Sequence, residues 1–129
     1  MVEKRISGRK VHFLKEISTI LCPIDFSDAS ETALQAAVEL AETMNSEVCL
    51  LHAVSRLDPV PTPSVALTPP ILDQLPLFME QMKTNAAAAM EDLEKRRVAG
   101  RVPVRHKVVI GSPADSIVRI SAETEAYLI

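Results

Sequence analysis

The stretch "ILCPIDFSDAS", Ile20–Ser30, decides the fold. Residues 17–24 form an apolar run that is rich in β-branched side chains and lacks a clean polar–apolar alternation. Such a run predicts a short strand that is buried on both faces, as in a parallel sheet. Asp25 follows at the end of this strand, and small hydroxyl and acidic residues typical of a helix start come next.

The rest of the chain alternates helices and strands. Ser27 or Asp28 can cap the first helix, with Glu31 completing a reciprocal cap. Apolar residues then recur at helical spacing: Leu34, Ala37, Val38, Ala41 and Met44. Further strands are predicted over 47–55 and 102–110, with a fourth beginning at "AYLI", 126–129. A second helix is predicted from about residue 71 or 76 to 98, with Pro76 near its start. A third follows "GSPAD", 111–115, with Ser112 as its cap and Asp115 as the reciprocal acid.

This alternation predicts an α/β fold, with an open parallel sheet, helices on both faces and right-handed crossovers. Residues 16–129 form the single domain that we expect. Residues 1–15 are predicted to be a flexible basic leader, and an arm that binds a partner is the alternative. Five prolines between residues 58 and 70 predict a loop there.

Bulk composition excludes several classes of protein. The net charge of −3 over 129 residues argues against sequence-independent binding of nucleic acid, which needs a basic face. The sequence contains no run of about 18 apolar residues, so no membrane span is predicted. A signal peptide would carry an apolar block after its charged N-terminus, and none follows here. We therefore expect a cytoplasmic protein. Cys22 and Cys49 lie in apolar runs and are interpreted as reduced core residues, with a disulfide or a reactive thiol as alternatives.

Asp25 is the candidate binding residue. Ligands of open parallel sheets bind beyond the carboxyl ends of the strands, where Asp25 lies, and Pro23 leaves the backbone beside it without a ladder donor. Asp25 could accept hydrogen bonds from a ligand, or it could only cap the turn; spacing leaves both readings open. The Gly111–Asp115 turn could offer amides to phosphate, but none of the three glycines belongs to a glycine-rich phosphate motif.

Other chemistry finds little support in the sequence. Histidines and cysteines show no metal-ligand spacing, and His52 is interpreted as a hydrogen-bonded histidine of a buried strand. No nucleophile is paired with a base, so we assign no catalytic residue and no metal ligand, and a small α/β enzyme is disfavoured.

Three segments resemble the universal stress protein family. They are "ILCPIDFSDASETALQAAVELA" (20–41), with its Pro-x-Asp-x-Ser turn, "SEVCLLHAV" (46–54), and "GSPADSIVRISAETEAYLI" (111–129). The resemblance covers about residues 16–129. It implies a Rossmann-like, adenine nucleotide alpha hydrolase-like fold with five parallel strands, commonly a homodimer. Many members bind ATP and others do not. By this resemblance Pro23 and Asp25 border the adenosine, and Ala53 lies beside adenine.

The sequence departs from the family pattern at its end. ATP-binding members carry a Gly-x-x-Gly and a Gly-Ser/Thr segment after the fourth strand, and this chain stops at Ile129 before either. We expect a shortened domain without the last helix and the fifth strand. It would bind ATP or another adenine nucleotide weakly or not at all. The resemblance thus predicts a non-catalytic stress-response module with a partial adenine-nucleotide pocket. The alternative is a regulatory protein that acts through self-association without a nucleotide.

Overall fold

A computed structural model describes residues 4–6, 9–11, 18–55 and 69–129. Its centre is a parallel sheet in the order β3 (Thr19–Pro23), β4 (Glu47–Val54), β5 (Val104–Ile110). On the other side of β3, where a fourth strand was predicted to begin, Leu128 forms an isolated parallel bridge with Ile20. β3 therefore has backbone partners on both sides, although it is the edge strand of the three-stranded sheet.

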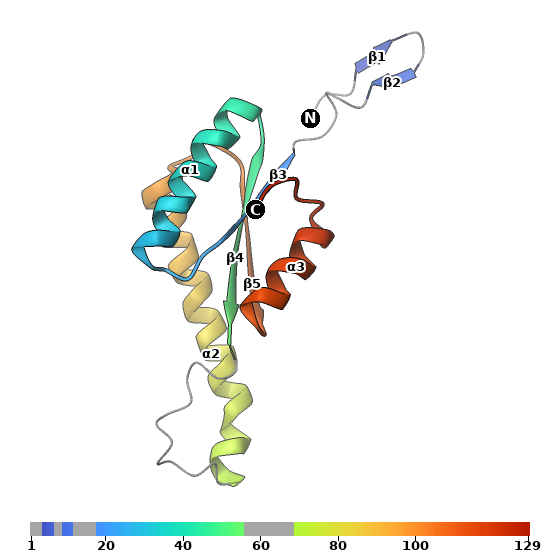
Figure 1. The fold of residues 1–129 in the computed structure, drawn as a ribbon. Helices are drawn as coiled ribbons and strands as arrows, with labels where there is room; N and C mark the ends of the chain where they lie inside the picture. The colour runs from blue at the N-terminus through green and yellow to red at the C-terminus, as the bar shows by residue number, and fades with distance from the viewer. Residues whose placement is uncertain (1–3, 7–8, 12–17, 56–68) are drawn as a thin grey trace.

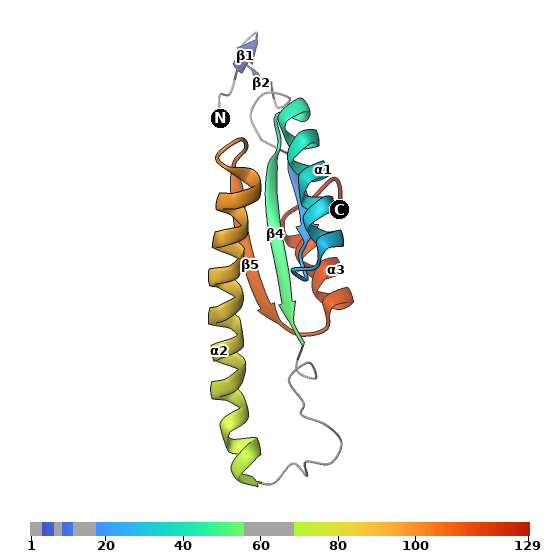
Figure 2. The same ribbon diagram turned by 90° about the vertical axis from the view of Figure 1, so that its left-hand side faces the viewer.

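Helices cover both faces of this sheet. Helix α1 (Asp28–Met44) and helix α2 (Pro69–Leu93) lie on one face, and α3 (Pro113–Glu123) lies on the other (Figures 1 and 2). A π-helical turn, η2 (Glu94–Val98), continues α2 before the chain enters β5. The predicted α/β fold with an open parallel sheet is confirmed.

The core consists of two layers because successive strand residues point to opposite faces. Ile20 and Cys22 of β3 pack with Leu34 and Val38 of α1, whereas Leu21 packs with Ile120 of α3. β4 alternates in the same way, and its Val48, Cys49 and Leu50 are all fully buried. Burial on both faces explains why these runs show no polar–apolar alternation.

Local signals place the ends of α1. Ser27 is its N-cap, and the hydroxyl oxygen accepts a hydrogen bond from the Ser30 amide at 3.2 Å. Asn45 ends the helix in the left-handed conformation, at φ 53°. The predicted reciprocal cap by Glu31 is wrong, because the Glu31 carboxylate instead lies 2.7 Å from the Arg97 guanidinium.

Helix α2 begins earlier than its prolines suggested. Pro69 and Pro70 were predicted to lie in a loop, but both belong to the first turn of the helix, where a missing amide hydrogen costs no bond. Pro76, expected near the start, lies inside the helix, where proline removes one backbone hydrogen bond. The remainder of the predicted loop, 58–68, lies outside the described residues.

The predicted leader contains a short hairpin of β1 (Lys4–Ile6) and β2 (Arg9–Val11), paired antiparallel. The flexibility of residues 1–15 stays a prediction, since residues 1–3, 7–8 and 12–17 lie outside the described part. None of the helices in the described ranges has both the length and the apolar character that a membrane crossing needs.

Candidate functional site

A hollow of about 350 Å³ lies at the carboxyl ends of β3 and β4, under the first turns of α3. The three predicted site residues, Pro23, Asp25 and Ala53, all line it. The complete lining comprises Pro23, Ile24, Asp25, Leu51, His52, Ala53, Pro113 and Ile117.

The position of the hollow follows from the topology. The chain leaves β3 through α1 on one face and reaches Leu128, on the opposite edge of β3, through α3 on the other face. Connections on the two sides of β3 thus diverge beside its carboxyl end, which is where ligands bind in open parallel sheets.

The Asp25 carboxylate is fixed by the residue that caps α1. Its Oδ1 accepts hydrogen bonds from the Ser27 amide, at 2.9 Å, and from the Ser27 hydroxyl. These bonds, the hydroxyl bond first, lower the pKa of Asp25 from 3.8 to about 2. Asp25 is therefore an ionised hydrogen-bond acceptor in an exposed turn at neutral pH, and it both supports the turn and lines the hollow.

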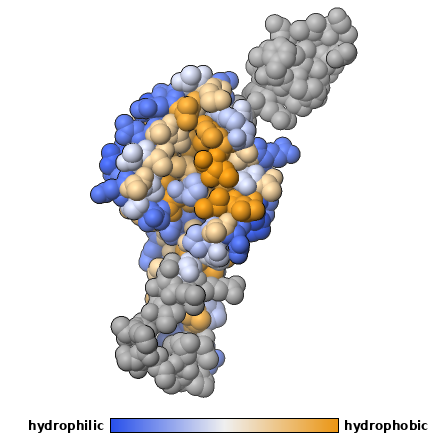
Figure 3. Space-filling view, in the orientation of Figure 1, coloured by the Kyte–Doolittle hydropathy of each residue, from blue (hydrophilic) through white to orange (hydrophobic). Residues whose placement is uncertain are grey.

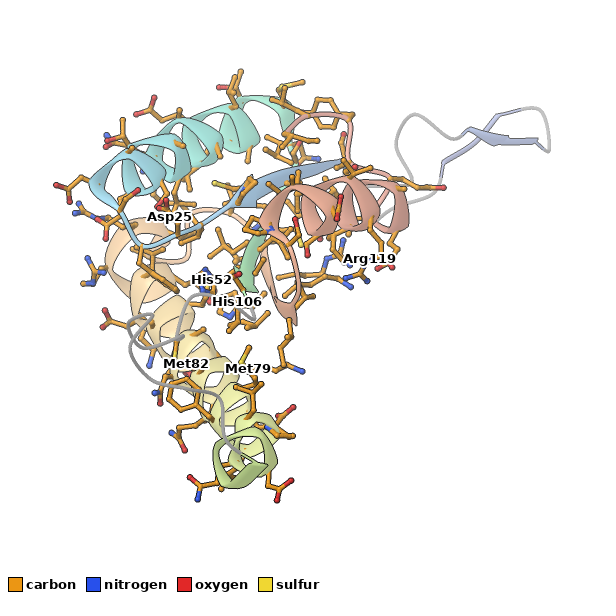
Figure 4. All side chains as sticks on the ribbon, turned by 60° about the horizontal axis from the view of Figure 1, so that its bottom comes forward. Asp25, His52, Met79, Met82, His106 and Arg119 are labelled. Atoms are coloured by element: carbon orange, nitrogen blue, oxygen red, sulfur yellow. The ribbon has the colours of Figure 1, made fainter. Side chains whose placement is uncertain are left out.

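His52 lies on β4 next to the Asp25 turn, and Figure 4 shows the two side chains on neighbouring elements. Its Nδ1 is 2.6 Å from the carbonyl oxygen of Ile24. Its ring centroid lies 4.8 Å from that of Phe26, with 50° between the planes. His52 is half-buried, so its interpretation as a hydrogen-bonded histidine is confirmed.

The first turns of α3 form the far wall of the hollow through Pro113 and Ile117. The Ser112 carbonyl accepts from the Ser116 amide at 2.9 Å, and Pro113 occupies the first turn as predicted. The Ser112 side chain makes no capping hydrogen bond, so the predicted hydroxyl cap is wrong. The main-chain turn and the proline define the start of this helix without it.

A family model described as the universal stress protein family matches residues 16–129. The chain belongs to the universal stress protein family.

Solved structures agree with this assignment at the level of the fold. The universal stress protein UspA from Lactobacillus plantarum matches with a TM-score of 0.64 at 21% identity, over 82% of this chain and 69% of that one. The hypothetical protein MJ0577 matches with a TM-score of 0.66 at 23% identity, over 84% and 69%. A universal stress protein solved in complex with cAMP matches with a TM-score of 0.54 at 20% identity, over 84% and 66%. No curated protein matches the chain.

Both cysteines of this universal stress protein are free and buried. Cys22 pairs with Leu50 in the ladder and Cys49 with Leu21, so the two thiols point to opposite faces of the sheet. Burial raises the pKa of Cys22 to about 11 and also raises that of Cys49. The core interpretation is confirmed; a disulfide between them is excluded by the geometry, and buried thiols with raised pKa are poor nucleophiles.

The described part of the chain holds no group of three or more histidine, cysteine, aspartate or glutamate side chains that could bind a metal ion. A smaller, polar hollow of about 190 Å³ lies between α1 and η2, lined in part by Asp28 and Arg97. This hollow was not predicted from the sequence, and neither were the contributions of His52, Pro113 and Ile117 to the larger one. For these three the available signal was their place directly after or near a strand's carboxyl end.

Proposed function

We propose that this universal stress protein is a non-catalytic stress-response module that binds the nucleoside part of an adenine nucleotide in the hollow. One observation carries the proposal: Pro23 at the end of β3, Asp25 in the turn after it and Ala53 of β4 meet at one hollow beside the point where the connections diverge. Family membership supports it, as does the related structure that contains cAMP.

The chemistry of the hollow suits a nucleoside. About 350 Å³ falls near the lower end of small-molecule sites, which typically span about 300–1,000 Å³. Its lining is mostly apolar, as a base requires, and Asp25 adds one ionised carboxylate. A carboxylate only accepts hydrogen bonds, so the partners we propose for it are ribose hydroxyls or an amino group. Ala53 is small and leaves room for a flat base beside β4.

Binding of the phosphates is proposed to add little. Within the described ranges, neither lysine nor arginine lines the hollow, while Asp25 places a negative charge there. We therefore expect adenosine, AMP, cAMP and ATP to bind with similar affinity, with dissociation constants of roughly 0.1–1 mM.

A non-catalytic role agrees with the state of Asp25. A general base works best with a pKa near the working pH, whereas the Ser27 hydrogen bonds hold the pKa of Asp25 at about 2. Cytoplasmic location is part of the proposal, since both cysteines remain unpaired as in reducing compartments.

The experiment is calorimetric titration with adenosine and ATP of the wild-type protein and of Asp25→Asn. Asparagine retains an acceptor for Ser27 but loses the charge, so we expect about tenfold weaker binding with the fold intact. Asp28→Asn is the matched control, because Asp28 lies in the first turn of α1 and outside the larger hollow. No heat of binding at millimolar ligand would contradict the proposal, and equal losses in both variants would remove Asp25 from it. Micromolar affinity for ATP would reject weak phosphate contact.

Self-association is a second candidate function, and a surface feature favours it. Figure 3 shows apolar side chains gathered in the middle of the face where Figure 1 places the C-terminus. Exposed apolar residues of α1 and the chain end form this edge patch: Leu40, Met44, Tyr127, Leu128 and Ile129. The Tyr127 hydroxyl lies 3.0 Å from the Met44 sulfur, which joins the two parts of the patch. We propose a homodimer through this patch.

A further inference from the structure

We propose that His52 is a positioning residue of the hollow, which holds the Asp25 turn from both sides through a hydrogen bond to Ile24 and a ring contact with Phe26. The inference deepens the proposed function and rests on it, because it assigns a role to a residue that lines the hollow without being the charged acceptor.

The first contact fixes the backbone directly before Asp25. The β3–β4 ladder ends at the pair Pro23 and Leu51, and Ile24 is the first residue beyond it. The Ile24 amide still donates to the Leu51 carbonyl at 2.7 Å. The Ile24 carbonyl oxygen forms a hydrogen bond with the His52 Nδ1 at 2.6 Å. Two consecutive residues of β4 thus bind both main-chain polar groups of Ile24. The Leu51 carbonyl binds its amide, and the His52 side chain binds its carbonyl.

The second contact lies directly after Asp25. Phe26 has φ 64°, a left-handed conformation that is strained for a residue with a side chain. Such a conformation persists only where the surroundings enforce it. The His52 ring packs against the Phe26 ring at a centroid separation of 4.8 Å and supplies part of that support. One side chain therefore contacts both neighbours of Asp25.

The hydrogen bond also settles which ring nitrogen carries the proton. A carbonyl oxygen only accepts, so Nδ1 must donate, and Nε2 holds the lone pair of the neutral ring. The role of His52 in the turn consequently needs a donor on Cγ, in the position of Nδ1.

Two substitutions separate the donor from the ring. His52→Asn keeps an amide nitrogen on Cγ, where histidine carries Nδ1, but removes the ring. His52→Phe keeps an aromatic ring beside Phe26 but has no donor, and leaves the Ile24 carbonyl without its side-chain partner. His106→Phe is the matched control, because His106 lies 2.6 Å from Glu94 and outside the hollow.

The first readout is the carboxyl pKa of Asp25, which NMR titration measures. This pKa reports on the Ser27 hydrogen bonds and needs no ligand. We expect about 2 in the wild type and in His106→Phe, and a rise toward 3.8 in His52→Phe as the turn loosens. His52→Asn should stay closer to the wild type than His52→Phe does. An unchanged Asp25 pKa in folded His52→Phe would overturn the proposal.

The second readout is adenosine binding, which should weaken about three- to tenfold in His52→Phe and less in His52→Asn. If the wild type binds no adenosine, the proposed function fails while the carboxyl titration still decides whether His52 positions the turn. If His52→Phe does not fold, His52→Gln is compared with His52→Asn instead. Both lack the ring, and the glutamine amide lies one bond farther from the backbone than Nδ1, so the pair tests the position of the donor. The same outcomes then support or overturn the role.

Discussion

At the scale of single residues, Asp25 has two roles: its carboxylate supports the turn before α1 and it lines the hollow. Its Oδ1 accepts two hydrogen bonds from Ser27, and Ser27 in turn caps α1. The sequence left a capping aspartate and a ligand-binding aspartate open as alternatives. The geometry is compatible with both at once, because the carboxylate that supports the turn also lines the hollow.

The pKa of Asp25 gives a test of the turn by acid. Because the folded-state value of about 2 lies below the ordinary 3.8, the stabilisation is complete above pH 3.8 and is lost as the pH falls toward 2. We predict that the wild type is more stable than Asp25→Asn at pH 6 and that this difference shrinks by pH 3. Urea unfolding at both pH values measures it. A difference that is equal at the two pH values would show that the Ser27 bonds do not depend on the charge.

At the scale of elements, most of the fold was predictable because its signals are local. Apolar runs marked the strands, and the predicted capping residues Ser27 and Ser112 lie at the N-terminal ends of α1 and α3. The start of α2 was missed because prolines are as acceptable in a first helical turn as in a loop. Nothing in the residues signalled the π-helical turn η2.

The end of η2 offers a test of helix termination. Ala99 is the C-cap there at φ 51°, and its amide donates to the Glu94 carbonyl at 3.0 Å. Glycine adopts this conformation without a steric cost. We predict that Ala99→Gly stabilises the protein by up to about 1 kcal/mol.

The matched control for that change is Ala88→Gly in the exposed middle of α2. The same chemical change should there destabilise by about 1 kcal/mol, because glycine loses more backbone entropy in a right-handed helix. Urea denaturation of both variants measures the two signs. Destabilisation by Ala99→Gly would mean that backbone entropy outweighs the strain at the cap.

At the scale of the whole molecule, the hollow results from the packing of the helices against the sheet, which local sequence patterns do not specify. Its place could be anticipated, because the carboxyl ends of parallel strands share one edge of the sheet. Its detailed walls could not, since they depend on contacts between distant residues. The His52–Ile24 bond spans 28 positions and the Arg97–Glu31 bond spans 66. A single sequence contains such residues but does not indicate which of them contact one another.

The edge patch allows a prediction for the molecule as a unit. Its five side chains are only partly exposed, from 38% at Leu128 to 62% at Ile129. Stable dimers usually bury about 1,200–2,000 Å² in total, more than so few side chains supply. We therefore predict a weak dimer, which forms at about 0.1 mM and above, in sedimentation velocity over a range of concentrations.

Charge placed in the edge patch should abolish that dimer. Met44→Lys puts a cation beside Tyr127, at the point where α1 meets the chain end, and burying an unpaired charge costs more than a weak interface provides. Leu77→Lys is the matched control, because Leu77 is 75% exposed on α2 and lies outside the patch. The control should sediment as the wild type does. A wild-type protein that stays monomeric at the highest concentration would leave the hollow, and not the patch, as the feature on which its function depends.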